Sequence, residues 1–447
     1  MTTQGVLDLG LPDDVYKAEV VAGRAEYGTF KDSLRAPIHR WFTYPAGFSY
    51  KGVEEAFREH GIESGMTVYE PFAGTATTNV VAKAQGVHSW GFEAHPFVAF
   101  VAQTKLFWEF DGLGLQKSID ELVVAIRSAL SRGLQEEEAR AAFPELVGKC
   151  YAPDKLARLW VCRLAIERLP VTPFRDLAKL ALTNILRALA DVETGWPYIA
   201  PDKPKSSSPD VVGAFREQLY AMAGDIAQVV RQKRGEARTQ VARGDARALH
   251  SEIESGSVDF SFTSPPYLNN FDYADRTRLE TYFWGESKSW SDITQNVRSQ
   301  LIMSATTQAL RTGFSAQSAL SPELCACAPD VAAILQPKIE RLGELRLVKG
   351  GKKSYDMMVA GYFNDMLLAV REAWRVLKPH AAFVLVLGDS APYGVHIETD
   401  VLLGEIGIAA GFRSYTLENL RTRGGKWKNN PQRHTVALRE SILTLIK

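Results

Sequence analysis

The chain is poor in cysteine and carries no net charge. Its 447 residues include four cysteines, and 52 Lys and Arg residues balance 52 Asp and Glu residues. No two cysteines form a CxxC pair and none has a histidine at zinc-binding spacing, so we expect neither a metal site nor a disulfide framework. Because the charge is balanced, any contact with nucleic acid must come from a local basic patch.

Long apolar runs are also missing. No stretch of about 18 apolar residues is present, and the N-terminus lacks the basic and apolar regions of a signal peptide. We therefore expect a soluble cytoplasmic protein with no membrane contact, in keeping with the low cysteine content. A hydrophobic fraction of 46% and a charged fraction of 23% are enough for one large domain with insertions or for two to three domains.

The most specific local motif is Thr263-Ser264-Pro265-Pro266-Tyr267. The alternating run at 258–262 predicts a strand, so the motif is expected at the carboxyl end of a strand, where open α/β sheets bind ligands. Two prolines remove two amide donors and leave the Ser264 and Pro265 carbonyl groups facing something other than a neighbouring strand. An amino group would satisfy them, and Tyr267 offers a ring for stacking a planar base. A Pro-Pro turn with an aromatic plug is the structural alternative.

Three further segments have the pattern of a nucleotide-binding sheet. Residues 66–78 predict a strand, a tight turn at Gly74 and a helix start, with backbone amides facing the ligand. About 20 residues later a strand-like run ends in Glu93, from where a carboxylate can accept from both ribose hydroxyls. Another run ends in Gly244-Asp245-Ala246, where an acid could accept from an adenine amino group. Because that run directly precedes 255–267, we expect the two strand ends to be neighbours.

Two segments interrupt this pattern. Residues 106–237 show helical periodicity and are interpreted as a helical insertion, whereas 296–354 lack sustained periodicity and are interpreted as a second, variable insertion. Both are candidates for target recognition. The predicted division of the chain is therefore 1–105 for cofactor binding, 106–237 and 296–354 as insertions, 238–295 for the catalytic loop, and 355–447 for the C-terminal part of the sheet.

The C-terminal part predicts a long helix from 356 to 377, a strand at 382–387, a helix at 398–410, and two final strands at 413–420 and 435–446. The loop between the final strands carries five Lys or Arg residues and a tryptophan. This mixture is typical of a nucleic-acid contact, with a solvated hairpin tip as the alternative. The candidate DNA-binding residues are Arg421, Arg423, Lys426 and Lys428.

Together these motifs resemble the amino-methyltransferases of DNA, the S-adenosylmethionine-dependent enzymes that modify cytosine N4 or adenine N6. The resemblance covers roughly 30–105, 238–285 and 355–447. The first motif departs from the family's usual form, with Glu70 in place of Asp and Ala76 in place of Gly. The segments that carry the resemblance are Tyr44-Pro-Ala-Gly-Phe48, Glu70-Pro-Phe-Ala-Gly-Thr-Ala-Thr-Thr78, Phe92-Glu93, Gly244-Asp245-Ala246 and Ser264-Pro-Pro-Tyr267.

The resemblance implies an α/β fold, a Rossmann-like seven-stranded sheet with one antiparallel strand and a large helical insertion, and S-adenosylmethionine as the cofactor. It implies double-stranded DNA as the substrate and a cognate restriction endonuclease or defence-system subunit as a candidate partner. The implied catalytic residues are Ser264, Pro265, Pro266 and Tyr267. The implied cofactor-binding residues are Tyr44, Glu70, Phe72, Gly74, Thr75, Thr77, Glu93, Asp245 and Ala246.

Position 264 bears on the target base. Within the family, Ser before Pro-Pro-Tyr is commoner among cytosine-N4 enzymes and Asp among adenine-N6 enzymes, so we expect methylation of cytosine N4, with adenine N6 as the alternative. An RNA or protein amine methyltransferase could use a similar loop. A non-catalytic nucleic-acid-binding protein is a third reading, against which the intact acids and catalytic motif argue. The Pro-Cys nucleophile of carbon-5 methylation is absent from the sequence.

Overall fold

The chain forms two compact units, each assembled from separate segments of the sequence. The computed structural model describes residues 16–17, 28–44, 47–195, 199–205, 209–269, 271–309, 316–423 and 436–447. The first unit contains Met1–Gly28, Arg247–Asn270 and Ile302–Lys447, and the second contains Thr29–Ala246 and Phe271–Leu301. Two of the predicted DNA-binding residues, Lys426 and Lys428, lie outside the described residues.

The second unit is built on parallel strands in the order β2-β3-β6. The β2-α2-β3-α3 succession confirms the predicted order of strand, turn, helix and strand. Parallel strands end at one edge, and the pairing of Glu93 with Arg243 places the ends of β3 and β6 side by side. The elements are α1 (Tyr50–Glu59), β2 (Thr67–Glu70), α2 (Thr77–Gln85), β3 (His88–Glu93), α3 (Pro96–Lys105) and β6 (Thr239–Arg243).

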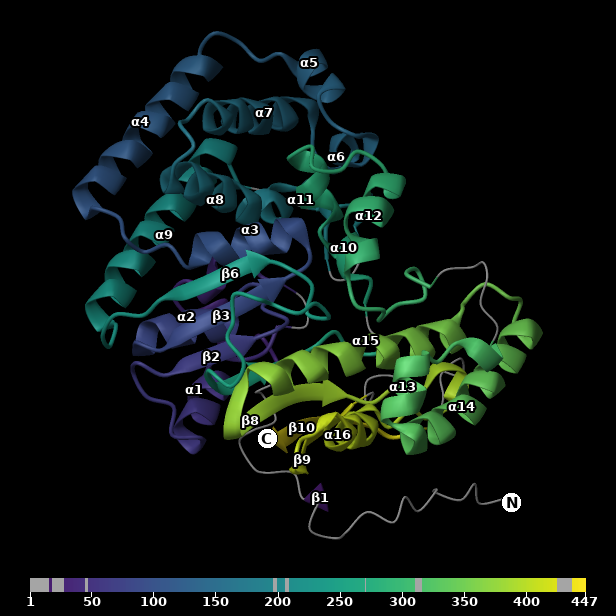
Figure 1. Cartoon of the computed structure of the whole chain (residues 1–447). Helices are drawn as coiled ribbons and strands as arrows, with labels where there is room; N and C mark the ends of the chain where they lie inside the picture. Colours follow the sequence, from purple (N-terminus) through teal and green to yellow (C-terminus); the bar gives the residue numbers. More distant parts are fainter. Residues whose placement is uncertain are drawn as a thin grey trace. The chain divides into compact units, whose positions relative to one another are not determined.

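The segment between α3 and β6 is helical, as predicted (Figure 1). It also contains a short antiparallel ribbon of two strands that the periodicity did not indicate. Its elements are α4 (Gly112–Leu130), α5 (Glu136–Ala141), α6 (Glu145–Cys150), α7 (Pro153–Glu167), α8 (Pro173–Leu189), β4 (Val192–Glu193), β5 (Ala200–Pro204) and α9 (Val211–Gln232). The rest of the unit comprises η1 (Asp32–Leu34), η2 (His39–Trp41), α10 (Tyr273–Arg276), α11 (Arg278–Phe283), α12 (Trp290–Asn296) and η3 (Arg298–Gln300).

The helical insertion shares one hydrophobic core with α3 and η2 of the second unit. Buried Leu159, Leu186 and Phe215 of α7, α8 and α9 belong to the same cluster as Val101 of α3 and Trp41 of η2. A shared core couples the two parts mechanically, because closely packed side chains transmit displacements. The insertion is therefore an integral part of this unit and not an appended domain.

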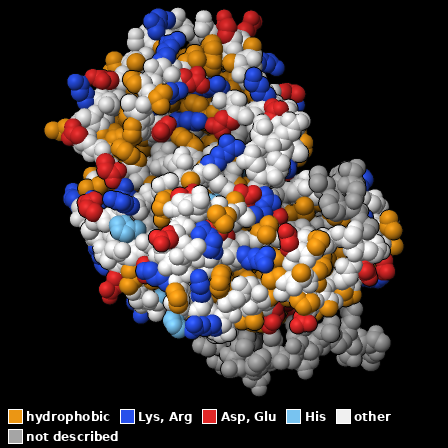
Figure 2. Space-filling view, viewed as in Figure 1, with side chains coloured by type: hydrophobic (Ala, Val, Ile, Leu, Met, Phe, Trp, Pro, Cys, Tyr) orange, Lys and Arg blue, Asp and Glu red, His pale blue; other side chains and the backbone are white. Residues whose placement is uncertain are grey.

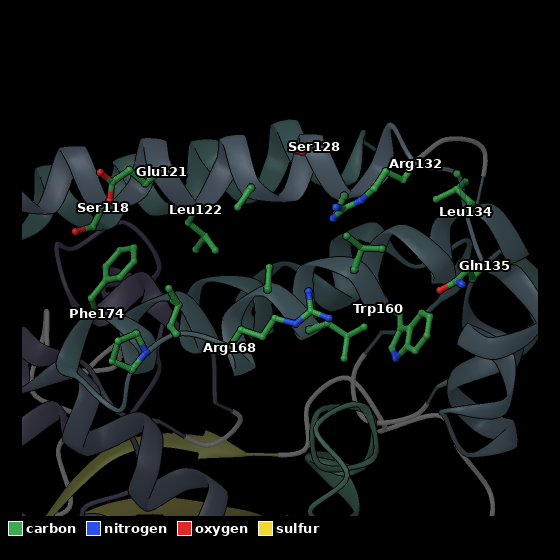
Figure 3. A pocket seen from close by; sticks show the side chains of 18 of the residues that line it. Ser118, Glu121, Leu122, Ser128, Arg132, Leu134, Gln135, Trp160, Arg168 and Phe174 are labelled. Carbon is green, nitrogen blue, oxygen red and sulfur yellow. The ribbon is translucent and has the colours of Figure 1, made fainter.

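A groove of about 980 Å³ lies in the insertion between α4 and α7 (Figure 3). Leu122 and Val161 contribute apolar walls, and Arg132, Arg168 and Trp160 extend into it. Among the described residues, neither arginine forms an ion pair. In Figure 2 hydrophobic side chains are visible at the surface of this region, while Lys and Arg alternate with Asp and Glu elsewhere on the face shown.

The first unit has its strands in the order β1-β9-β10-β8-β7. β7 is parallel to β8 and β1 to β9, whereas β10 runs antiparallel to both β8 and β9. The tail hairpin therefore supplies the antiparallel strand that the family resemblance implied, in a mixed α/β fold consistent with a Rossmann-like methyltransferase. The strands are β1 (Tyr16–Lys17), β7 (Val258–Thr263), β8 (Leu377–Gly388), β9 (Ser414–Arg423) and β10 (Leu438–Ile446).

One predicted adjacency is wrong. The strand ending before Gly244 was expected beside the strand ending at Thr263, because the two follow each other in the sequence. Instead β6 pairs with β3 and β7 pairs with β8. Parallel strands are joined by crossovers and not by tight turns, so closeness in sequence does not fix which strands pair.

The helices of the first unit match the C-terminal predictions, but the second insertion is more ordered than expected. Buried Val331, Leu335, Ile339 and Leu342 form a helical stripe in α14, so the prediction of no sustained periodicity there is wrong. Pro337 inside the helix masks this stripe in the sequence. The elements are η4 (Ala316–Ser318), α13 (Pro322–Cys327), α14 (Pro329–Val348), α15 (Tyr355–Val376), η5 (Pro392–Gly394) and α16 (Thr399–Ala410). Over the described residues, no helix has the length and apolar character needed to cross a bilayer.

Candidate active site

The turn between β2 and α2 is held by Glu70. One carboxylate oxygen accepts from the Phe72 N–H at 3.1 Å, and the other accepts from the Thr78 hydroxyl at 2.7 Å. The side chain is fully buried, so these bonds offset the cost of removing the charge from water. Glu70 therefore fixes the shape of the turn.

Positive φ angles at Gly74 and Ala76 shape the same turn. Their φ values are 52° and 66°, and Ala76 immediately precedes α2. A left-handed conformation costs an alanine about 1–2 kcal/mol, which explains physically why the family prefers glycine at position 76. Thr75 and Thr77 are buried beside it. The turn leaves the first amides of α2 at its N-terminus, the arrangement that suits an anionic or polar ligand group.

Glu93 lies at the carboxyl end of β3 and contacts this turn directly. One carboxylate oxygen accepts from the Gly74 N–H at 2.9 Å and the other from the His95 N–H at 2.7 Å. Burial raises the pKa of Glu93 from 4.5 to about 7, although the backbone N–H groups lower it. A half-buried carboxyl with such a pKa, placed at the end of a strand, is a candidate ligand-binding group.

Gly244, Asp245 and Ala246 follow β6 at the same edge. The Gly244 N–H donates to the Glu93 carbonyl oxygen at 3.2 Å, which ties the two strand ends together. Asp245 is half-buried and Ala246 is buried. The structure thus brings the predicted ribose-binding and adenine-binding segments together.

Tyr44 comes from the loop after η2 and faces the same region. Burial raises the pKa of Tyr44 well above its usual value, and the Glu93 carboxylate adds to the effect. Its ring lies 6.1 Å from the ring of Tyr273, and Tyr44 also lines a cavity of about 170 Å³. That volume is below the range of about 300–1,000 Å³ found for small-molecule pockets, so the cavity alone is no cofactor site.

Asp225 of α9 anchors the loop that carries Tyr44, a role that the sequence did not reveal. Its carboxylate accepts from the Ile38 N–H at 3.2 Å, from the Trp41 indole at 3.0 Å, and from two nitrogens of Arg40 at 2.9 and 2.6 Å. Asp225 is only 3% exposed. The helical insertion therefore fixes the segment that leads to Tyr44.

The predicted catalytic loop belongs to the first unit and follows β7. The Ser264 hydroxyl donates to the Val386 carbonyl oxygen of β8 at 3.1 Å. With its hydrogen engaged, the hydroxyl oxygen keeps its lone pairs for an incoming N–H donor. Ser264 and Pro266 are half-buried, and Pro265 is buried between them.

Tyr267 is 6% exposed and is held from two sides. Its hydroxyl donates to a Glu440 carboxylate oxygen at 3.0 Å, and the Arg423 guanidinium lies over its ring, 5.1 Å from the centroid. Arg421 donates to the other Glu440 oxygen at 2.5 Å. Both predicted DNA-binding arginines therefore contact side chains or backbone around the catalytic loop.

The carboxyl end of β8 carries further polar groups of the first unit. The Asp389 side chain is buried and accepts from the Arg439 N–H at 2.7 Å, while its other oxygen lies 2.7 Å from His396 Nε2. Its carbonyl oxygen accepts from Arg423 at 3.3 Å. Among the described residues, no cluster of three or more His, Cys, Asp or Glu side chains could hold a metal ion.

The sequence of the chain was compared with known protein families and proteins. No family model matches the chain. The chain is 23% identical to the Type II methyltransferase M.BsoBI of Geobacillus stearothermophilus, over 93% of this chain and 86% of that protein. It is 24% identical to the Type II methyltransferase M.AvaI of Anabaena variabilis, over 91% of this chain and 85% of that protein. It is 19% identical to the Type II methyltransferase M.MvaI of Kocuria varians, over 94% of this chain and 93% of that protein.

The chain is thus similar to Type II methyltransferases over more than nine-tenths of its length.

Proposed function

We propose that the protein is a site-specific DNA methyltransferase that transfers a methyl group from S-adenosylmethionine to an exocyclic amine of a flipped base. The observation that carries the proposal is the Ser264-Pro-Pro-Tyr267 loop at the end of β7, in a chain of which 93% aligns with a Type II methyltransferase. A restriction-modification setting, with a cognate endonuclease as partner, accompanies this proposal.

The second unit offers groups that fit the cofactor. Glu93 presents a carboxylate able to accept from two ribose hydroxyls, and Asp245 an acceptor for an adenine amino group. The backbone amides at the start of α2 and the Tyr44 ring would surround the rest of the cofactor. When bound, S-adenosylmethionine supplies an electrophilic methyl group on a positively charged sulfur.

The catalytic loop acts by positioning. The Ser264 oxygen and the Pro265 carbonyl accept the two N–H groups of the target amine, which draws them out of conjugation and leaves the nitrogen lone pair directed at the methyl group. Flipping the base out of the duplex costs a few kcal/mol. Tyr267 then holds the flipped base by stacking. Correct placement of reacting atoms supplies most of the acceleration.

We propose cytosine N4 as the target. The hydroxyl of Ser264 both donates to Val386 and accepts from the amine, whereas a carboxylate there could only accept. Mass spectrometry of nucleosides from DNA treated with the protein and S-adenosylmethionine tests this. N4-methylcytosine is expected; N6-methyladenine alone would assign the adenine alternative, and methyl transfer only to RNA or protein would overturn the DNA assignment.

The affinity for S-adenosylmethionine is expected to rise with pH. Glu93 has a pKa of about 7 in the free protein, and ribose hydroxyls donate best to the ionised form, so binding requires loss of the proton. The dissociation constant at pH 6 should be about tenfold higher than at pH 8. Calorimetry across this range measures it.

The Glu93→Gln variant is the control for that pH dependence. It keeps the size of the side chain and cannot ionise, so its weaker binding should stay constant between pH 6 and 8. A wild-type affinity that does not change over this range would remove Glu93 from the ribose site.

The hairpin loop between β9 and β10 is proposed to contact DNA phosphates. Lys426→Ala combined with Lys428→Ala should weaken binding to all DNA sequences alike and reduce the salt slope by about 2, one unit for each lost phosphate contact. Arg421 and Arg423 are left intact in this test because Arg423 lies over the Tyr267 ring and Arg421 donates to Glu440, the acceptor of the Tyr267 hydroxyl. Filter binding at several salt concentrations gives the slope.

The matched control combines Lys51→Ala with Lys378→Ala. These changes remove the same charge elsewhere, and the two lysine side chains are 56% and 46% exposed. An equal change in salt slope for both double variants would show that only net charge matters and that the hairpin makes no particular contact.

A further inference from the structure

Glu440 is a buried carboxylate with partners on both sides. Its side chain is 2% exposed, one oxygen accepts from the Tyr267 hydroxyl at 3.0 Å and the other from Arg421 Nε at 2.5 Å. A buried charge is costly unless it is paired and hydrogen-bonded, and both conditions hold here. The Glu440 carboxylate is therefore paired with Arg421 and hydrogen-bonded to the hydroxyl of Tyr267, the proposed catalytic tyrosine.

The strand register in the sheet of the first unit determines where Glu440 and Arg421 lie. The β9–β10 pairing shifts register between Glu440 and Ser441, which sets Glu440 opposite Arg421 on one side, while Gly388 stands opposite Glu440 on the other. Such bulges re-aim side chains and are common beside active sites. Because the register shift is local, the contact between Glu440 and Arg421 is specific to this point of the hairpin.

Two glycines make room for the arrangement. A Cβ atom at Gly388 would overlap the Arg423 guanidinium and lie 3.2 Å from the Tyr267 ring, and a Cβ at Gly28 would overlap the Glu440 carboxylate. Neither glycine needs a positive φ. Their missing side chains therefore serve the close approach of Arg423, Tyr267 and Glu440.

We propose that Glu440, oriented by Arg421, is a positioning residue that fixes the Tyr267 ring in the plane on which the flipped base stacks. A tyrosine ring held only by packing can tilt about its side-chain torsions, whereas a hydrogen bond at the far end of the ring fixes both its tilt and its depth. Arg423 lies over one face of the same ring, so the base is proposed to stack on the opposite face. The inference rests on the proposed function, because it assigns a role within the same site.

The test uses full-length protein and a duplex containing the mapped methylation site. Glu440→Ala should lower kcat by about 10- to 100-fold, because a small misplacement of the reacting groups has effects of that size, with little change in S-adenosylmethionine affinity. Glu440→Gln keeps an acceptor for the tyrosine and should recover a large part of the rate. Fluorescence of 2-aminopurine next to the target base should show a less ordered flipped state in the alanine variant.

A double-mutant cycle separates positioning from general stability. Tyr267→Phe removes the hydroxyl and keeps the ring, so Glu440→Ala added to it should change kcat by less than about twofold if Glu440 acts through that hydroxyl. Full additivity of the two changes would overturn the inference, as would a wild-type kcat in Glu440→Ala. Should the alanine variant fail to fold, Tyr267→Phe alone decides the question: its kcat should fall about as far as that predicted for Glu440→Ala, and a wild-type kcat in Tyr267→Phe would overturn the inference.

The proposed function and this inference fail in different ways. Wild-type protein that methylates no DNA overturns the proposed function and with it the role of Glu440. Wild-type protein that methylates DNA, with Glu440 variants that keep its kcat and flipping signal, leaves the proposed function standing and removes only the positioning role.

Discussion

Replacing Ser264 with alanine is expected to lower the rate of methyl transfer by about 100-fold while leaving S-adenosylmethionine affinity within about twofold of the wild type. The hydroxyl links β7 to the Val386 carbonyl of β8 and presents its oxygen at the loop. Without it, the proposed site loses one of two acceptors for the target amine, and the nitrogen lone pair is no longer aimed at the methyl group. Binding of the cofactor depends on other residues, so its affinity should not follow the rate.

Single-turnover methylation with labelled cofactor measures this rate, and Ser257→Ala provides the matched control. Ser257, next to the start of β7, also donates its hydroxyl to a carbonyl oxygen, that of Glu254 at 2.7 Å. Its loss should leave the rate unchanged. Equal rates for Ser264→Ala and the wild type would show that Pro265 alone is enough to orient the amine.

Replacing Asp225 with alanine is expected to lower the free energy of unfolding of the second unit by about 3 kcal/mol. The substitution leaves the Ile38 N–H and the Trp41 indole N–H buried without their acceptor, at about 1–3 kcal/mol each. The ion pair with Arg40 adds less, because the Arg40 side chain is 42% exposed and screened by water. S-adenosylmethionine affinity should fall as well, since Tyr44 follows this anchor by three residues.

Thermal unfolding monitored with and without cofactor tests the role of Asp225. Glu217→Ala is the control, because it removes a carboxylate from the exposed face of the same helix α9. Asp225→Asn keeps one acceptor and should lie between the wild type and alanine. An Asp225→Ala protein as stable as the Glu217→Ala protein would contradict the anchoring role.

The cofactor half of the site was predictable because its motifs are local. Periodicity and spacing alone predict that Gly74 lies in the turn of a strand–turn–helix segment. They also predict that Glu93 lies at the end of the next strand. The structure then ties them together through a 2.9 Å hydrogen bond between the Gly74 N–H and the Glu93 carboxylate. Local patterns also located α15, α16 and both strands of the tail hairpin.

The supporting residues were not predictable because their partners are distant in sequence. Asp225 contacts residues near position 40, and Glu440 contacts Tyr267, so neither contact leaves a trace in local spacing. A hint existed in each case: Asp225 and Glu440 are acids on the apolar side of a helix or strand, where an unpaired charge would be costly. Such positions in a sequence call for a partner, although they do not say which one.

The interleaving of the two units along the chain sets the order in which they can be completed during synthesis. The second unit ends at Leu301, whereas β1 pairs with Leu417 and Glu418 of β9. β1 is made at Tyr16–Lys17, about 400 residues before its partners in β9, so at about 5–20 residues per second it waits roughly 20–80 s. β8 ends at Gly388, whose partner Glu440 is made roughly 3–10 s later. Until then both strands have an unpaired edge, the kind of surface on which nascent chains associate wrongly. Expression yield should therefore depend on chaperones that protect the early strands until the C-terminal hairpin emerges.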